Sequence, residues 1–202
     1  MSGGRRDTKE NIISSALTLF GQTHDIRKVS LEAIAKTAGV SPTTIYNVFG
    51  NRENLVFETV RALVQRSLET NRQTVQLSLP FPQKLAAILS RKQDLLVQYN
   101  AELLEKIMSQ DESIKPFMDK IYSQEIKPML AAILNEGREQ GYISPEMDQN
   151  ALLLYLDIIR AGFNSRPDLS GEIIRNPELV QSLSKIIFYG FIHKDAVLFK
   201  EK

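Results

Sequence analysis

Residues 29–55 read VSLEAIAKTAGVSPTTIYNVFGNRENL and contain the strongest structural signals in the chain. Ser30 can cap a short helix, because its hydroxyl oxygen can accept a hydrogen bond from an unpaired amide of the first turn. Gly39 suits the left-handed conformation that ends many helices, and Ser41 and Pro42 are typical of the N-cap and the first position of the next helix. The stretch therefore predicts two short helices joined by a tight turn.

These two helices, with one before them, fit a helix-turn-helix. Ala35 is small where two helices must cross closely, and Ile45 can anchor the second short helix on an apolar core. A preceding helix is expected over residues 8–21, where apolar residues recur at spacings of three and four. Asp7 and Glu10 are predicted to form a capping box at its start.

The rest of the chain is also predicted to be helical, since it shows no sustained strand-like alternation. Asn51 can cap a long helix that ends near Val75, and the two prolines of residues 78–82 mark a boundary after it. A kink or a division of the helix is expected at Lys127-Pro128. Further helical segments are predicted near residues 83–98, 101–109, 115–140, 148–164 and 177–193.

Composition excludes several classes of protein. The chain has 202 residues, of which 43% are hydrophobic and 24% charged, as is ordinary for a folded globular protein. It has no cysteine, which excludes disulfides and thiolate zinc sites, and its two histidines, His24 and His193, are interpreted as surface side chains. Because it has no apolar signal core and no apolar stretch of about 18 residues, the sequence predicts a cytoplasmic protein without a membrane span.

The charge is distributed unevenly along the chain. Residues 1–50 contain six Lys or Arg and four Asp or Glu, so this part carries +2 while the whole chain carries +1. A basic excess at the N-terminus is consistent with a DNA contact there. Arg5 and Arg6 are either a disordered solubilising tail or an arm that touches the DNA backbone.

The outward face of the second short helix offers polar side chains for DNA. Thr43, Thr44 and Asn47 can bond base edges in a major groove, which is wide enough to admit an α-helix. Tyr46 can reach a phosphate or a thymine methyl group, although a core position is the alternative interpretation for this aromatic residue. Phe49 is expected in the core.

Three elements of this region together resemble the signature of the TetR family of regulators: Ala-Gly-Val-Ser at 38–41, Ile-Tyr-x-x-Phe at 45–49 and Arg-Glu-x-Leu at 52–55. The resemblance covers roughly the first 60 residues. It implies an all-α fold in which a three-helix helix-turn-helix head, residues 1–52, is joined by a long helix to a larger helical domain. That second domain, residues 53–202, would bind an effector and form a dimer.

The resemblance also implies DNA contacts at individual positions: Ser30, Ser41, Thr43, Thr44, Tyr46, Asn47 and Arg52. Ser30 would meet a phosphate at a helix N-terminus, where unpaired amides favour anions. Arg52 stands where the family usually has lysine and can hold a phosphate through its planar guanidinium group. Glu32 would repel phosphate on the DNA side of the motif.

In the C-terminal part, Asp157 and Arg160 interrupt an otherwise apolar segment at i, i+3 spacing. Three assignments are open: an intrahelical ion pair, an ion pair across a subunit interface, or ligand contacts, the last together with Tyr122 and Asn164. In the family, the C-terminal helices wall an effector cavity and the last two usually pair with their copies in a dimer. The final segment has too many apolar side chains for an exposed helix, including Leu179, Leu183, Ile186, Ile187, Tyr189 and Phe191.

These features favour a repressor that forms a homodimer through its last two helices and binds a palindromic operator in double-stranded DNA. The repressor would respond to an unidentified small molecule. One alternative is a constitutive or architectural DNA-binding protein without an effector, and another is a helical protein-interaction module. An enzyme is disfavoured, and no catalytic residues, cofactor or metal are expected. The chain has no phosphate-cradling glycine loop, nucleophile elbow or metal-ligand cluster.

Overall fold

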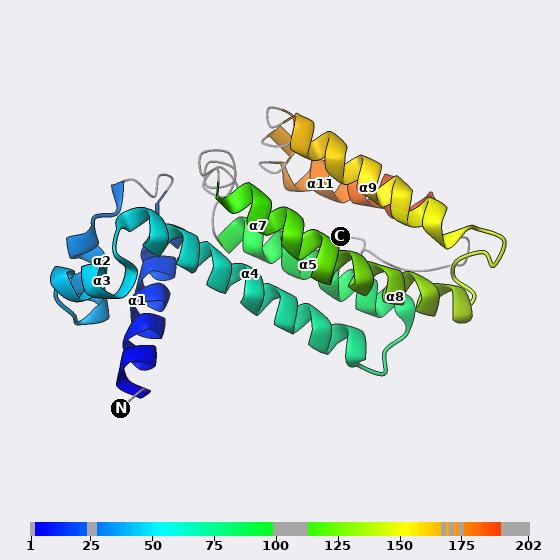
Figure 1. Ribbon diagram of the computed structural model, residues 1–202. Coiled ribbons are helices and arrows are strands. Elements are labelled where there is room, and N and C mark those ends of the chain that lie inside the picture. The colour runs from blue at the N-terminus through cyan, green and yellow to red at the C-terminus, as the bar shows by residue number, and fades with distance from the viewer. Residues whose placement is uncertain are drawn as a thin grey trace.

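The protein folds as a small head and a larger body, joined by one long helix (Figure 1). Every regular element in the described residues is a helix, so the predicted all-α fold is confirmed. The head consists of α1 (Gly3–Gly21), α2 (Leu31–Ala38) and α3 (Pro42–Phe49), and α4 (Arg52–Gln76) runs from it into the body. The computed structural model describes residues 3–23, 28–98, 113–166, 169, 172–173 and 176–190.

The turn between α2 and α3 has the geometry that the sequence predicts. Ser30 Oγ accepts a hydrogen bond from the amide of Ala33 at 3.1 Å, and Ser41 Oγ accepts one from the amide of Thr44 at 3.0 Å. Gly39 has a φ of 67°, in the left-handed region where a side chain would be strained. The two caps and the glycine together fix the directions of α2 and α3.

Helix α1 begins earlier than predicted. It starts at Gly3 rather than near Thr8, so Asp7 and Glu10 lie inside the helix and the predicted capping box is wrong. No proline interrupts this stretch, and Arg6 forms an ion pair with Glu10 one turn later, with Nε and Oε1 3.3 Å apart. The N-terminal arginines therefore stand on a helix and do not form a disordered tail.

The head has one apolar core, which includes the first half of α4. Its most deeply buried side chains, each at most 1% exposed, are Ile12, Ala16, Ile34, Ile45 and Leu55, together with Ile114 from the body. Val56 and Val60 extend the same core along α4. Because α4 supplies part of this core, the head must follow α4 when that helix shifts.

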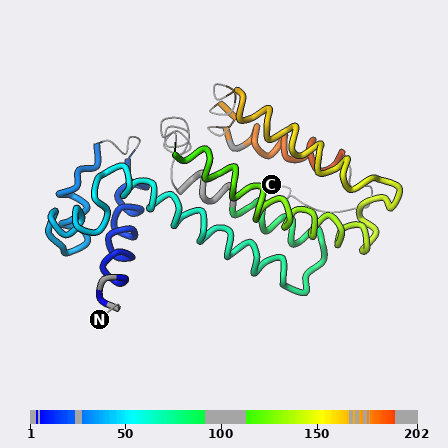
Figure 2. Tube along the Cα trace, in the orientation of Figure 1, coloured from blue at the N-terminus to red at the C-terminus, as the bar shows by residue number. Residues whose placement is uncertain are grey.

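In the described residues, the body is built from the second half of α4 and from six further segments. These are α5 (Phe81–Gln98), α7 (Ile114–Ile121), the π-helical turn η2 (Tyr122–Ile126), α8 (Lys127–Glu139), α9 (Gln149–Ser165) and α11 (Pro177–Tyr189). The predicted kink at Lys127-Pro128 coincides with the end of η2, so the predicted segment 115–140 is a helix with a π turn inside it. Of the other predicted segments, 101–109 and the end of 177–193 lie outside the described residues (Figure 2).

A second core holds the body together where α5 approaches α8. Phe81 and Ile143 are fully buried in it, with Leu85, Ile133, Leu134 and Leu152 around them. Gly137 lies where α8 passes Phe81, and a Cβ at this position would stand 2.8 Å from the phenylalanine ring. Only glycine therefore permits this close approach. Within the described residues, no helix is both long and apolar enough to cross a membrane.

Buried charge also links the elements at this end of the body. Lys84 of α5 is 6% exposed, and its Nζ lies 2.8 Å from the carbonyl oxygen of Val75 and 2.8 Å from Glu136 Oε2. The ammonium group thus has an ionic partner on α8 and a carbonyl partner at the end of α4. Removing the Glu136 partner alone would leave a buried charge unpaired, which is costly.

Candidate DNA-binding interface

Helix α3 presents a polar outer face and an apolar inner face. Ile45 and Phe49 are buried in the head core, whereas Thr43 and Asn47 are exposed and Tyr46 is 65% exposed. The alternative that Tyr46 is a core residue is therefore wrong. An exposed aromatic side chain between polar neighbours, on a helix that protrudes from a small head, is suited to insertion into a major groove.

The N-terminus of α3 is organised by hydroxyl groups. Ser41 Oγ lies 2.9 Å from Thr44 Oγ1 and also caps the Thr44 amide, so each hydroxyl is already engaged within the helix. Thr44 is half-buried, in contrast to the exposed Thr43. Of the two, Thr43 therefore has the freer access to an external partner.

The N-terminus of α2 carries a serine and a glutamate side by side. Hydrogen bonds from the Glu32 amide and from the Ser30 hydroxyl lower the pKa of the Glu32 carboxyl group. The carboxylate is therefore charged at neutral pH. It lies beside Ser30, at the helix N-terminus that would otherwise attract a phosphate.

Arg52, the first residue of α4, makes a contact that the sequence does not predict. Its Nη1 donates a hydrogen bond of 2.6 Å to the carbonyl oxygen of Val29, in the loop before α2. The side chain is half-buried. One of its functions is thus to join the start of α4 to the start of the helix-turn-helix, and the guanidinium group has further N–H donors.

Three other side chains that sequence reasoning missed hold the motif in place. Asn11 Nδ2 donates to the carbonyl of Ala38, the last residue of α2, at 2.7 Å. Lys9 Nζ lies 2.7 Å from Glu58 Oε2 of α4 and 5.8 Å from the centre of the Phe49 ring. These contacts cross between elements far apart in the sequence, so no local pattern could have revealed them.

Three of the four predicted ligand residues, Tyr122, Asp157 and Arg160, fall into a polar cluster between the long α7–η2–α8 helix and α9. Asp157 binds two residues of that helix: the Tyr122 hydroxyl donates to Oδ1, and Lys127 Nζ lies 2.5 Å from Oδ2. These two hydrogen bonds, that of Lys127 first, hold the pKa of Asp157 below its usual range. Burial, and then the bond to Asp157, raise the pKa of Tyr122 to about 12.

Arg160 belongs to the same cluster but has another ionic partner. Its Nη1 lies 3.1 Å from Asp119 Oδ1 of α7, and its guanidinium group stacks 3.8 Å from the centre of the Tyr122 ring. Each charged residue of α9 therefore pairs across to the neighbouring helix, so the intrahelical Asp157–Arg160 ion pair is not formed. Asn164, the fourth predicted ligand residue, is exposed one turn further along α9.

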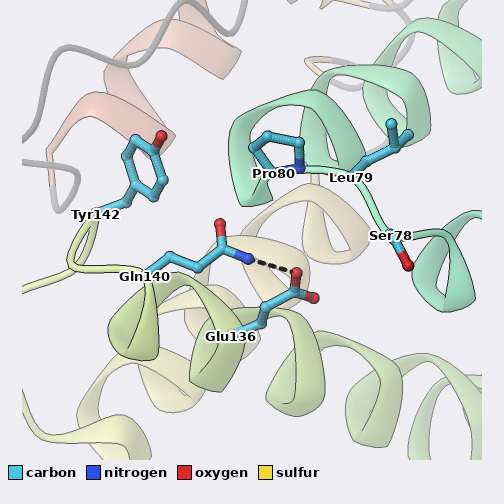
Figure 3. A pocket seen from close by; sticks show the side chains of 6 residues that line it. All are labelled: Ser78, Leu79, Pro80, Glu136, Gln140 and Tyr142. Atoms are coloured by element: carbon cyan, nitrogen blue, oxygen red, sulfur yellow. Dashed lines mark hydrogen bonds between the residues drawn. The ribbon is translucent and has the colours of Figure 1, made fainter.

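A separate hollow of about 580 Å³ opens at the far end of the body, lined by Ser78, Leu79, Pro80, Glu136, Gln140 and Tyr142 (Figure 3). None of the predicted ligand residues lines it. Gln140 donates from Nε2 to Glu136 Oε1 at 2.7 Å and accepts at Oε1 from the amide of Phe81 at 2.7 Å. These two bonds hold the Gln140 side chain in place at the wall of the hollow. Among the described residues, no group of His, Asp or Glu side chains is arranged to hold a metal.

Helices α9 and α11 carry large apolar side chains on the surface of the body. The exposed residues are Leu154, Tyr155 and Ile158 on α9 and Ile186 and Tyr189 on α11, and the exposed fraction reaches 68% at Ile186. The two helices lie on the side of the body away from α4 (Figure 1). Apolar side chains gathered in this way are typical of a surface that binds a protein.

Comparisons with known proteins agree with this architecture. Residues 12–59 match the family model described as bacterial regulatory proteins, tetR family. The chain is 25% identical over 158 residues to the fatty acid metabolism regulator protein of Bacillus subtilis (strain 168), a match that covers 71% of this chain and 75% of the relative. It is 19% identical over 162 residues to the HTH-type transcriptional repressor KstR2 of Mycobacterium tuberculosis, covering 77% of this chain and 79% of that protein.

Solved structures extend the likeness over the body. The transcriptional regulator FadR from Bacillus subtilis, in complex with stearoyl-CoA, superimposes with a TM-score of 0.62 at 21% identity, covering 91% of this chain and 99% of that one. Head and body together thus have the fold of these regulators. The helix-turn-helix region is thus similar in sequence to the tetR family of bacterial regulatory proteins, and the whole chain is similar to FadR in fold.

Proposed function

We propose that this protein is a cytoplasmic, ligand-responsive repressor whose homodimer binds a palindromic operator. Residues 1–52 form the DNA-binding domain and residues 53–202 the domain for effector binding and dimerisation. The observation that carries the proposal is the outer face of α3, where the 65% exposed Tyr46 stands among polar side chains over a buried Ile45 and Phe49. A helix built in this way can enter a major groove without disturbing the core beneath it.

Within this proposal the head residues divide into two kinds of contact. Thr43, Tyr46 and Asn47 contact base edges and the flanking backbone from the exposed face of α3. Ser41 and Thr44 support these contacts at the N-terminus of α3, with their hydroxyls near the backbone phosphates. Ser30 and Arg52 meet phosphate at the N-termini of α2 and α4. The negative charge of the Glu32 carboxylate limits how closely a phosphate can approach Ser30.

The dimer of the proposal is formed by the exposed apolar faces of α9 and α11. A monomer that displayed Leu154, Ile158 and Ile186 to water would forgo about 25 cal/mol for each Å² of apolar surface that a partner could cover. Two-fold pairing of these faces presents two α3 helices to one duplex. A symmetric protein of this kind matches an inverted repeat in its operator.

A long-chain acyl-CoA thioester is the first effector to test, because FadR from Bacillus subtilis was solved with stearoyl-CoA and the 25% identical match is named as a fatty acid metabolism regulator. The polar cluster of Tyr122, Asp157, Arg160 and the exposed Asn164 supplies candidate contacts for the polar end of a ligand. An effector of the repressor must bind the DNA-released state more tightly than the DNA-bound state.

The effector proposal is tested by titrating stearoyl-CoA into the complex of the full-length protein with a duplex recovered from a random-sequence pool. We expect DNA affinity to fall by about 5- to 150-fold at saturation, the usual range of coupling between two sites. Coenzyme A without the acyl chain is the matched control and is expected to leave affinity unchanged. If stearoyl-CoA binds without changing DNA affinity, or does not bind, it is not the effector. If no small molecule alters DNA binding, the constitutive alternative holds.

A further inference from the structure

The long helix that faces both α4 and α9 contains a π turn, η2, at Tyr122–Ile126. The amide of Lys127 bonds to the carbonyl of Tyr122, five residues back, where an α-helix would use the fourth. The backbone remains helical on both sides, as α7 before the turn and α8 after it. A single π turn inside a long helix inserts one extra residue into its register, which is costly unless neighbouring contacts hold it.

Asp157 of α9 supplies such contacts. It receives the Tyr122 hydroxyl on one carboxylate oxygen and Lys127 Nζ, at 2.5 Å, on the other. In an α-helix, two residues five positions apart point in directions that differ by roughly 140°, which is unfavourable for both to bind one carboxylate. The wider π turn brings Tyr122 and Lys127 onto the same face. The bidentate contact with Asp157 therefore selects the π form over the α form.

The opposite side of the same turn contacts α4. Glu125 lies within η2, and its Oε2 stands 2.6 Å from Arg72 Nη2, while Glu69 Oε2 lies 3.4 Å from Arg72 Nη1. Reverting the π turn to an α-helix would rotate the two flanking segments by about 100° relative to each other. Glu125 and Lys127 could not both keep their partners after such a rotation. The register of η2 thus links the carboxylate on α9 to the guanidinium group on α4.

We infer that Asp157 is a positioning residue for DNA binding: it holds the π register of η2, which aims Glu125 at Arg72 and so fixes α4 and the head that α4 carries. The inference rests on the proposed function. Helix α4 is continuous from Arg72 back to Leu55 and Val60 in the head core, so a change in its angle moves α3. Releasing the Arg72 contact broadens the range of head separations, and fewer molecules then match the spacing of the two half-sites.

A double-mutant cycle tests this connection, because Asp157 and Arg72 bind different residues of the same turn, Lys127 and Glu125 respectively. The variants are Asp157→Asn, Arg72→Gln and their combination in the full-length protein, with affinity measured for a duplex recovered from a random-sequence pool. We expect each single variant to weaken binding by about three- to tenfold, and the double variant to be no weaker than the weaker single one. If the two losses multiply, the residues act independently and the inference is wrong.

Further variants separate positioning from loss of structure. Glu139→Gln removes one negative charge from α8, where Glu139 accepts only a bond from Asn135 of the same helix among the described contacts, and is expected to bind DNA normally. Exchanging the pair as Arg72→Glu with Glu125→Arg should recover most of the affinity that Arg72→Glu alone loses. A failure to recover would contradict the inference. If Asp157→Asn does not fold, Tyr122→Phe replaces it in the cycle. This substitution removes only the hydroxyl that donates to Asp157 and leaves the contact with Lys127 in place.

The same measurements distinguish the two proposals. If the wild-type protein binds no duplex, the proposed function fails, and the inference fails with it. If the wild type binds a duplex and the cycle is multiplicative, only the inference is overturned.

Discussion

An Ile186→Glu variant is expected to sediment as a monomer and to lose tight binding to its operator. Ile186 is the most exposed large apolar side chain of α11, and Leu154 and Ile158, one turn apart on α9, are 59% and 62% exposed. A carboxylate buried in a symmetric interface would face its own copy as well as an apolar surface, and both effects oppose association. Because two linked heads bind at least about 100-fold more tightly than one, the variant should lose affinity by that factor or more.

The control for this variant is Leu77→Glu. Leu77 is 50% exposed and follows α4, so it is an apolar surface residue outside α9 and α11. It should remain dimeric and bind the operator normally. Two other apolar residues of this segment are less suitable for the substitution. Ile187 is half-buried, so a charge there could unfold the body, and Phe191 lies outside the described residues. Sedimentation and DNA titration on one sample decide the matter: a dimeric Ile186→Glu variant with normal binding would place the interface elsewhere.

A Tyr46→Ala variant is expected to fold normally and to bind the operator more weakly by about 1 to 3 kcal/mol per contact, which is roughly 5- to 150-fold. The phenol ring is 65% exposed and contributes little to the head core, so the thermal midpoint should change by no more than a typical surface substitution allows. In the groove, the same ring can contact a thymine methyl or a phosphate. Fluorescence anisotropy with a labelled duplex measures the loss of affinity.

Two neighbouring substitutions make this result specific. Phe49→Ala, on the inner face of the same helix, removes a 6% exposed core ring and should cost about 3 to 5 kcal/mol of folding stability. Tyr46→Phe keeps the ring and removes the hydroxyl, so it separates a phosphate contact from an apolar one. If Tyr46→Ala destabilises the head as much as Phe49→Ala, the exposed face of α3 is not a binding surface of the kind proposed here.

The head could be predicted from the sequence because its signals are local. Ser41 and Pro42 start α3, Gly39 permits the turn before it, and Asn51 caps α4 through the amide of Asn54 at 2.7 Å, each within a few residues of the group it bonds. The start of α1 was misplaced for the same reason, because Asp7 has the chemistry of an N-cap wherever it stands. Local chemistry does not show that a helix has already begun.

The body could not be predicted at the same level, because its contacts join distant parts of the chain. Asp157 and Arg160 have the spacing of an intrahelical pair, yet each pairs with a residue more than 25 positions away. Pro128 indicates an interruption but does not specify a π turn, since that form depends on the partners of Tyr122 and Lys127. The bond from Arg52 to Val29 is likewise a tertiary contact, formed only once α4 has packed against the loop.

The central claim is that two copies of the chain bind one palindromic site. It is tested most directly by selecting duplexes from a random-sequence pool with the wild-type protein and measuring the molar mass of the resulting complex. The account predicts that the recovered sequences share an inverted repeat and that two chains bind each duplex. It further predicts that a single half-site binds at least about 100-fold more weakly than the full repeat. Recovery of no common sequence, or tight binding of one chain to a single half-site, would contradict it.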